Sequence, residues 1–264
     1  MLNILFFTPV ILYFAAMVLQ FAGAAFKMDK VRKLAWVTLI AGVLVQTAYM
    51  IARGVAAGRV PLANQFEFAN AFARGTAVIG IFFKVRGKKT MDWMVTLAAP
   101  CAFLLISYAA LQPREITELM PALRSAWFTI HIGTAVFSYA ACAIAAAVGV
   151  RYLALEKKET EKHLRELDSL GYKLVSFGFL MLTIVILTGC IWAEQAWGSF
   201  WTWDPKEVWA LITWIVYAIY LHQRVRMNWR GHKMAVFGIG AFVFVMFTFV
   251  GVNTLMSGLH SYAC

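Results

Sequence analysis

The chain has 264 residues, of which 62% are hydrophobic and only 14% are charged. A soluble fold of this size cannot cover so large an apolar fraction with polar surface, so the composition indicates an integral membrane protein. The formal net charge of +11 would suggest a nucleic-acid partner if the protein were soluble. We expect no nucleic-acid partner, because membrane orientation explains where the basic residues lie.

Eight mainly apolar stretches are each close to the ~20 residues that a helix needs to cross a bilayer. They cover residues 3–26, 34–52, 66–83, 93–111, 127–150, 172–192, 205–222 and 234–256. The connections are too short to form a soluble domain. We therefore predict an all-α fold, a polytopic membrane helical bundle with short loops that forms a single domain over residues 1–264. The first stretch lacks a basic start and a small-residue cleavage site, which favours a first span over a removed signal.

Basic residues concentrate in alternate loops. Eighteen of the 24 Lys and Arg residues follow spans one, three, five and seven, namely Lys27, Lys30, Arg32, Lys33, Lys84, Arg86, Lys88, Lys89, Arg151, Lys157, Lys158, Lys162, Arg165, Lys173, Arg224, Arg226, Arg230 and Lys233. Loops rich in Lys and Arg stay in the cytoplasm. Both termini, and the connection between spans six and seven, are therefore predicted to lie outside.

The four cysteines are scattered along the chain and show neither a disulfide framework nor zinc-site spacing. The sequence also lacks Cys-x-x-Cys-His, the motif to which haem is attached in c-type cytochromes. A c-type cytochrome is therefore not expected, and the cysteines are interpreted as small buried apolar residues.

The connection between spans six and seven carries four of the ten tryptophans within thirteen residues: Trp197, Trp201, Trp203 and Trp209. We call residues 197–209 the tryptophan loop. An aromatic belt at the membrane interface explains indoles at this position, but it does not explain four in one short connection, interrupted by Asp-Pro-Lys-Glu. The pattern favours a binding surface for a flat aromatic ligand.

The polar residues of the tryptophan loop also have a local explanation. Asp204 suits a helix N-cap, Pro205 suits the first helical position, and Glu207 is placed as the acid of a capping box. Span seven is therefore predicted to begin here. Asp204 either only caps the helix or also orients the loop, and Lys206 either meets a ligand carboxylate or points to water.

Three of the five histidines lie at predicted membrane boundaries. His131 opens span five, His222 closes span seven and His260 follows span eight. The number of spans places His131, His260 and the tryptophan loop on the outer side, where two imidazoles from different helices could ligate a porphyrin iron from opposite faces. Taken alone, a boundary histidine is better explained as a hydrogen-bonded interfacial residue, so the assignment depends on the adjacent tryptophans.

Arg74 lies in the middle of span three, where a charge is costly unless it faces a partner or a polar cavity. Glu67 is about two helical turns earlier, so an ion pair with Arg74 is conceivable but long. The alternative is that the span boundary lies elsewhere.

The tryptophan loop resembles the WWD signature of haem-handling membrane proteins of cytochrome c maturation, of the CcsA/ResC type. Three segments carry the resemblance: the external loop at about residues 193–209, its continuation through Trp214 to His222, and Gly258-Leu259-His260-Ser261-Tyr262. By this resemblance, His131 and His260 are the outer axial ligands of haem b, and His222 meets haem near the cytoplasmic side. Trp197, Trp201, Trp203, Asp204, Lys206 and Trp209 would form the cofactor-binding surface.

The resemblance implies a protein that moves haem to the outer face and presents it for thioether attachment to the Cys-x-x-Cys-His motif of apocytochrome c. It also implies a CcsB/ResB-type membrane partner and a role as one subunit of a cytochrome c haem lyase. A haem chaperone that does not assist ligation, a membrane regulator of haem synthesis and a respiratory quinone or haem b subunit are the alternatives. A bacterial plasma membrane is expected, with a thylakoid membrane as the alternative.

Overall fold

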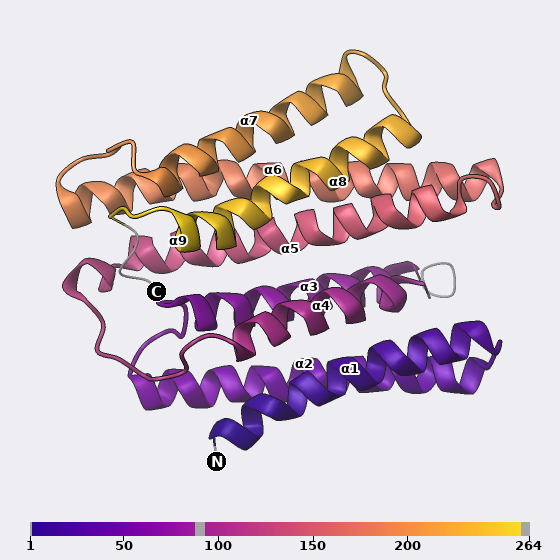
Figure 1. Ribbon diagram of the computed structural model, residues 1–264, viewed down its shortest axis with the longest axis horizontal. Coiled ribbons are helices and arrows are strands. Elements are labelled where there is room, and N and C mark those ends of the chain that lie inside the picture. The colour runs from indigo at the N-terminus through magenta and orange to yellow at the C-terminus, as the bar shows by residue number, and fades with distance from the viewer. Residues whose placement is uncertain (1, 88–92, 260–264) are drawn as a thin grey trace. The chain divides into compact units, whose positions relative to one another are not determined.

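The computed structural model describes residues 2–87 and 93–259, and these divide into two compact units, one within Met1–Glu118 and one within Leu119–Cys264. The long helices of unit 1 are α1 (Leu2–Ala25), α2 (Asp29–Ala57), α3 (Gln65–Gly87) and α4 (Met94–Ala110). Those of unit 2 are α5 (Ala126–Leu155), α6 (Glu161–Trp197), α7 (Pro205–Val225) and α8 (His232–Met246), and α8 continues through a π-helical segment (Phe247–Gly251) into the short α9 (Val252–Leu255) (Figure 1).

Each of the eight predicted spans overlaps one of the eight long helices, several of which extend beyond the predicted range, and residues 2–87 and 93–259 contain no β-strand. Six of the described helices are long and apolar enough to cross a membrane, and α4 is a shorter apolar helix. The remaining helix, α7, is not among these six. The predicted all-helical, polytopic membrane fold is confirmed.

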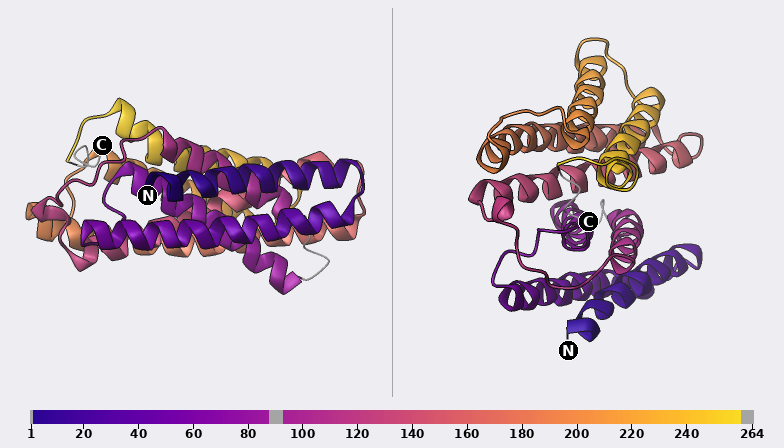
Figure 2. Two further views of the ribbon diagram at one scale, coloured as in Figure 1. Left: turned by 90° about the horizontal axis from the view of Figure 1, so that it is seen from below. Right: turned by 60° about the vertical axis from the view of Figure 1, so that its left-hand side comes forward.

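Unit 1 is built on two closely packed helix pairs, α1 with α2 and α3 with α4, and the antiparallel course of α1 and α2 is visible in both views of Figure 2. Small residues allow the second pair to approach closely. A Cβ added at Gly80 of α3 would lie only 2.2 Å from the Cβ of Ala98 on α4. Small residues at helix contacts are the usual device for tight packing in membranes, where no hydrophobic effect drives helices together.

Unit 2 is built around the long contact of α5 with α6. The alanine-rich middle of α5 is almost completely buried, from Ala140 through Ala146. A Cβ added at Gly178 of α6 would lie 2.8 Å from the Sγ of Cys142, and the Ser138 hydroxyl donates to the Gly178 carbonyl at 2.8 Å. The close approach expected from these small residues is therefore present.

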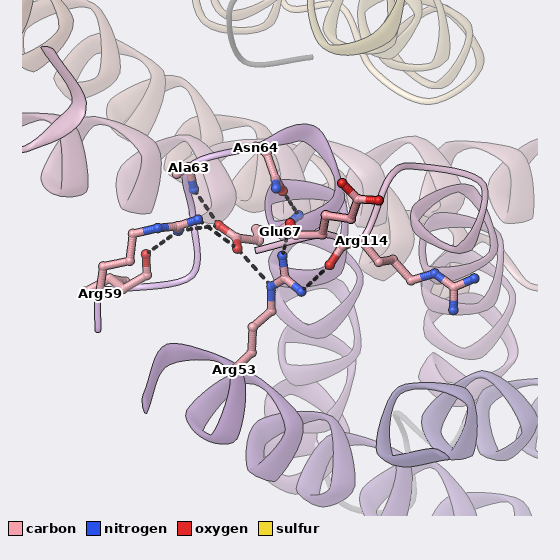
Figure 3. A network of polar contacts seen from close by, with 8 residues as sticks. Arg53, Arg59, Ala63, Asn64, Glu67 and Arg114 are labelled. Atoms are coloured by element: carbon pink, nitrogen blue, oxygen red, sulfur yellow. Dashed lines mark hydrogen bonds and ion pairs between the residues drawn. The ribbon is translucent and has the colours of Figure 1, made fainter. Parts of the chain in front are cut away.

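Glu67 does not pair with Arg74. Its carboxylate accepts from Arg53 Nε at 2.8 Å and from Arg59 Nη1 at 2.7 Å, and it also accepts the Ala63 backbone N–H at 2.8 Å (Figure 3). Glu67 pairs elsewhere because α2 and the α2–α3 connection bring two arginines closer to it than Arg74, which is two turns along the same helix. The Glu67 side chain is fully buried, so this network fixes the connection onto the start of α3.

Candidate functional site

One end of unit 2 gathers the predicted site residues that the structure describes, with the exception of His222. α5 and α7 begin there, and α6 and α9 end there (Figure 1). The basic-loop pattern predicts that this end faces outside, and we call it the outer end. It is held together across helices: Trp192 Nε1 donates to the Ala122 carbonyl at 2.8 Å, and Ser125, the N-cap of α5, donates to Gln195 at 2.7 Å.

The predicted capping box of α7 is present. Asp204 accepts the Lys206 N–H at 3.0 Å, Pro205 occupies the first helical position, and Glu207 reaches back to the Asp204 N–H at 3.2 Å. Glu207 also accepts the Thr202 N–H at 2.8 Å. Two carboxylates thus fix the connection between α6 and α7.

Asp204 does more than cap its helix. Its second oxygen accepts the backbone N–H of Leu259 at 2.5 Å, and a Cβ added at Gly258 would lie 2.3 Å from that same oxygen. Asp204 is only 6% exposed. The chain segment that leads directly into His260 is therefore anchored on the tryptophan loop, which favours the reading in which Asp204 also orients the site. His260 itself lies outside the described residues.

His131 lies in the second turn of α5 and is partly exposed. Its Nδ1 is 2.8 Å from the Val185 carbonyl oxygen on α6. A carbonyl only accepts, so Nδ1 carries the proton and the lone pair of the neutral ring is on Nε2. Metal-ligating histidines are typically oriented in this way, by a hydrogen bond from the other ring nitrogen.

Aromatic rings continue from His131 toward the tryptophan loop. The imidazole stacks on Trp192 with ring centroids 5.9 Å apart and planes 21° apart, and Trp192 contacts Trp197 edge-on at 4.8 Å. Gly189 leaves room for the imidazole, because a Cβ there would lie 2.9 Å from His131 Nδ1 and Cε1. The structure therefore brings His131 and Trp197 together through a buried indole.

The tryptophans of the loop take different positions. Trp197 ends α6 and Trp209 lies in α7, so only Trp201 and Trp203 lie in the connection between the helices. These two rings contact edge to face, with centroids 5.8 Å apart. Trp203 is 70% exposed, and its φ of +60° is in the left-handed region, which is unusual for a residue with a large side chain. An exposed indole held in a strained backbone is typical of a binding surface.

Lys206 and Trp209, near the start of α7, contact the π-helical segment and α9 that follow α8. Lys206 Nζ donates to Asn253 Oδ1 at 2.8 Å. The Trp209 ring lies 4.2 Å from that of Phe247, at the start of the π-helical segment. Segments with π-helical hydrogen bonding occur frequently at functional sites. Lys206 is therefore a polar contact between helices and does not simply point to water.

His222 lies on α7, thirteen residues beyond Trp209, or ~20 Å at ~1.5 Å per residue. It is exposed at the opposite, predicted inner end of unit 2. Beside it, Arg224 forms a largely buried ion pair with Asp168 at 2.6 Å. A small cavity of ≈ 20 Å³ there is lined in part by Asp168 and Tyr220. That volume has room for about one water molecule and not for a porphyrin, and His222 does not line it.

Sequence reasoning missed Trp192, Gly189 and Asn253, although each contacts a predicted site residue. Trp192 and Gly189 are three residues apart and so share one face of α6. A tryptophan paired with a glycine on one helical face, near a predicted ligand, was the available signal. Within the part of the chain that the structure describes, no group of three or more His, Cys, Asp or Glu could hold a metal ion.

The outer end fits a haem on three observations. The lone pair of the neutral His131 ring is on Nε2, the Trp192 indole stacks on that ring and contacts Trp197, and Lys206 supplies a cation at the same end for a propionate. Haem iron already has four porphyrin nitrogens and needs only one or two protein ligands, so a single described imidazole beside aromatic surface suffices for binding.

Comparisons with known proteins identify the family. Residues 2–260 match the family described as cytochrome C assembly protein. The chain is 37% identical over 224 residues to the cytochrome c biogenesis protein CcsA of Chlamydomonas reinhardtii, across 81% of this chain but only 64% of that protein. It is 32% identical to CcsA of Guillardia theta, across 98% of this chain and 94% of that protein.

A further relative is CcsA of Prochlorococcus marinus (strain MIT 9301), which is 30% identical across 91% of this chain and 87% of that protein. Among solved structures, the cytochrome c haem lyase CcmF has a similar fold, with a TM-score of 0.68 and 12% identity. The match covers 98% of this chain and 51% of CcmF. The chain therefore belongs to the cytochrome c assembly protein family, as a CcsA-type cytochrome c biogenesis protein.

Proposed function

We propose that this protein binds haem b at the outer end of unit 2 and presents it for thioether attachment to the Cys-x-x-Cys-His motif of apocytochrome c. One observation carries the proposal: His131 is oriented by the Val185 carbonyl so that Nε2 holds the lone pair, and its ring stacks on an indole. Family membership supports the same role, because the relatives are cytochrome c biogenesis proteins.

In this proposal, His131 and His260 are the two axial ligands. Trp197, Trp201 and Trp203 provide apolar surface for the macrocycle, and Trp209 supports the start of α7. Lys206 meets a propionate. Asp204 holds the segment that precedes His260, as its bond to the Leu259 N–H indicates.

The protein contributes orientation to the reaction. Holding the porphyrin vinyl groups beside the cysteine thiols of the apocytochrome makes a bimolecular addition effectively intramolecular, which can lower a barrier by several kcal/mol. The bond-forming chemistry itself belongs to the haem vinyl groups and the thiols. One of the two imidazoles must then give way to the histidine of the apocytochrome motif.

His222 is proposed to receive haem at the inner end. Its exposed side chain near the end of α7 supports a site completed by a second protein. We propose that a CcsB/ResB-type membrane protein supplies that surface and that the two proteins together form the haem lyase.

We further propose that the chain acts as a single haem-handling domain, although it contains two compact units. The protein spans a membrane several times, and we propose the bacterial plasma membrane, with the haem site facing outside. Fractionation of the natural host would distinguish this location from a thylakoid membrane.

The ligand assignment is tested by haem spectra of the purified protein. His131→Ala and His260→Ala should each convert six-coordinate haem at the outer end to a five-coordinate or more weakly bound form. His232→Ala is the matched control, because His232 is 61% exposed and pairs with Glu156 away from the outer end. Unchanged six-coordinate haem in both site variants would overturn the assignment.

The attachment step is tested separately with a c-type reporter, in a host that lacks its own maturation genes. Holocytochrome should form only when this chain and a candidate CcsB/ResB-type partner are both present. Haem binding without holocytochrome formation would instead indicate a haem chaperone. Failure to bind haem at all would favour a regulator of haem synthesis.

A further inference from the structure

A stripe of polar residues runs along one face of α3 in unit 1. Glu67, Asn70 and Arg74 are three and four residues apart, so they follow one another along the helix surface. Glu67 is neutralised by two arginines at the outer end of the stripe. Asn70 and Arg74 lie deeper and are not used by the outer site.

A chain of hydrogen bonds fixes the amide of Asn70. The Tyr13 hydroxyl donates to Gln46 Oε1 at 2.5 Å, and Gln46 Nε2 donates to Asn70 Oδ1 at 2.8 Å and to the Asn70 carbonyl at 3.0 Å. Rotating the Asn70 amide would set two donors against each other, so Oδ1 must face Gln46. Asn70 Nδ2 is then left as a donor, and it is buried without a hydrogen-bond partner among the described residues.

Arg74 repeats the pattern one turn further along α3. Its Nε is also buried, and residues 2–87 and 93–259 offer it no hydrogen-bond partner. Arg74 is nine residues from the start of α3 and thirteen from its end, or ~14 Å and ~20 Å at ~1.5 Å per residue. The backbone at Arg74 is thus near the middle of a helix that spans a ~30 Å hydrocarbon layer.

Two buried donors without hydrogen-bond partners, together with one positive charge at this depth, indicate the chemistry of the ligand that this part of α3 would bind. Both donors need an acceptor, the charge needs an anion, and the apolar surroundings of a membrane require that the anion be attached to an apolar body. Buried donors without partners are rare in native proteins, and ionisable residues within a membrane mark functional sites. A lipid phosphate does not fit, because headgroups lie outside the hydrocarbon layer.

We propose that Asn70 Nδ2 and Arg74 form a binding site for the carboxylate of an otherwise apolar ligand inside the bilayer. Resting on the proposed function, that carboxylate is a propionate of haem, held in unit 1 separately from the iron ligands of unit 2. Tyr13 and Gln46 act as positioning residues, because they fix the amide that donates.

The test compares porphyrins that differ only at the carboxylates. The full-length protein in lipid nanodiscs is titrated with protoporphyrin IX and with its dimethyl ester, which removes the charge without changing the ring. Neither probe contains iron, so axial ligation contributes nothing. The wild-type protein should bind the free acid about tenfold more tightly than the ester, the ratio that corresponds to ~1.4 kcal/mol.

In a Lys206→Gln background, which removes the propionate contact proposed at the outer end, Arg74→Gln should abolish the remaining preference by weakening the free acid and leaving the ester unchanged. In the same background, Asn70→Leu should reduce the preference. Arg86→Gln is the matched control, since Arg86 is an exposed arginine near the end of the same helix, and it should keep the full ratio. Equal binding of the two porphyrins to the wild-type protein, absence of binding, or equal loss of both ligands in Arg74→Gln overturns the inference.

Failure of this inference is distinguishable from failure of the proposed function. The latter is measured with haem and depends on His131, whereas the porphyrin ratio depends on Arg74. If the porphyrin preference is absent and Arg74→Gln instead releases a co-purified membrane protein, the carboxylate belongs to a partner helix and the small-ligand site is refuted.

Discussion

Replacing Gly189 with alanine tests the role of His131 with a single methyl group. Gly189 and Val185 are four residues apart on α6, and both face the imidazole of His131. The added Cβ would lie 2.9 Å from both Nδ1 and Cε1, whereas ordinary van der Waals contacts begin at 3.4 Å. The imidazole must therefore move by about 0.5 Å, away from the Val185 carbonyl.

The substitution has two effects, one on haem affinity and one on stability. Loss of the outer hydrogen bond of a metal-ligating histidine typically costs about 10–100-fold in affinity. We expect about tenfold, or ~1.4 kcal/mol, because Nε2 itself is not removed. Alanine in place of glycine within a helix contributes about 0.5–1 kcal/mol to stability, so the strain against the imidazole should be largely offset and the thermal unfolding temperature nearly unchanged.

The measurement is a haem titration of the purified protein, followed by absorbance in the oxidised and reduced states and paired with a thermal unfolding curve. Gly133→Ala is the control on the facing helix, because a Cβ at Gly133 meets nothing within 4 Å. It should leave haem affinity unchanged. If Gly189→Ala binds haem with wild-type affinity and an unaltered spectrum, His131 does not ligate haem through the tautomer described above.

Three further outcomes are expected. Asp204→Asn keeps a good N-cap but removes the charge that accepts the Leu259 N–H. Hydrogen exchange of the Leu259 amide should therefore be about fivefold faster, which corresponds to a loss of ~1 kcal/mol in protection. Unchanged exchange would show that other contacts hold the segment before His260. Trp203→Gly removes an exposed indole and also relieves a left-handed backbone conformation that costs about 1 kcal/mol. Haem affinity should therefore fall while the unfolding temperature stays unchanged or rises. A fall in both haem affinity and unfolding temperature would contradict a binding role for Trp203. Glu67→Gln leaves two buried arginines without their carboxylate partner and should lower the free energy of unfolding, measured by chemical denaturation, by about 3–5 kcal/mol. The control Glu161→Gln, at an exposed ion pair, should change that free energy by less than ~0.5 kcal/mol.

The helices and the start of α7 were predictable because they depend on local sequence. Apolar length identifies each span, and the capping box depends on Asp204, Pro205 and Glu207, which are consecutive or nearly so. α6 nevertheless extends from Glu161 to Trp197 rather than over the predicted 172–192. The predicted range covers only the apolar segment. A hydropathy criterion does not detect the polar turns that continue the helix, about three before residue 172 and about one after residue 192.

The partners of Glu67 were not predictable, because periodicity along α3 only identifies neighbours on the same helix. Arg53 comes from α2 and Arg59 from the connection, and their approach depends on how the helices pack. The same limit applies to Trp192, whose contact with His131 depends on the packing of α5 against α6. Sequence indicated which residue types carry the chemistry, and tertiary packing decided which of them meet.

The polar residues of the tryptophan loop set its shape, while the indoles set its surface. Glu207 accepts from the Thr202 N–H, the Thr202 hydroxyl and the Asp204 N–H, so the backbone on both sides of Trp203 is bound to one carboxylate. This clamp explains why Trp203 can remain in the left-handed region with its side chain exposed, since the cost of the strained backbone is offset by several hydrogen bonds to a charged group. Because Asp204 also receives the Leu259 N–H, the conformation of the loop and the position of the chain before His260 are coupled through adjacent residues. A substitution that releases either carboxylate should therefore disturb both halves of the outer site, even though neither carboxylate needs to touch the haem.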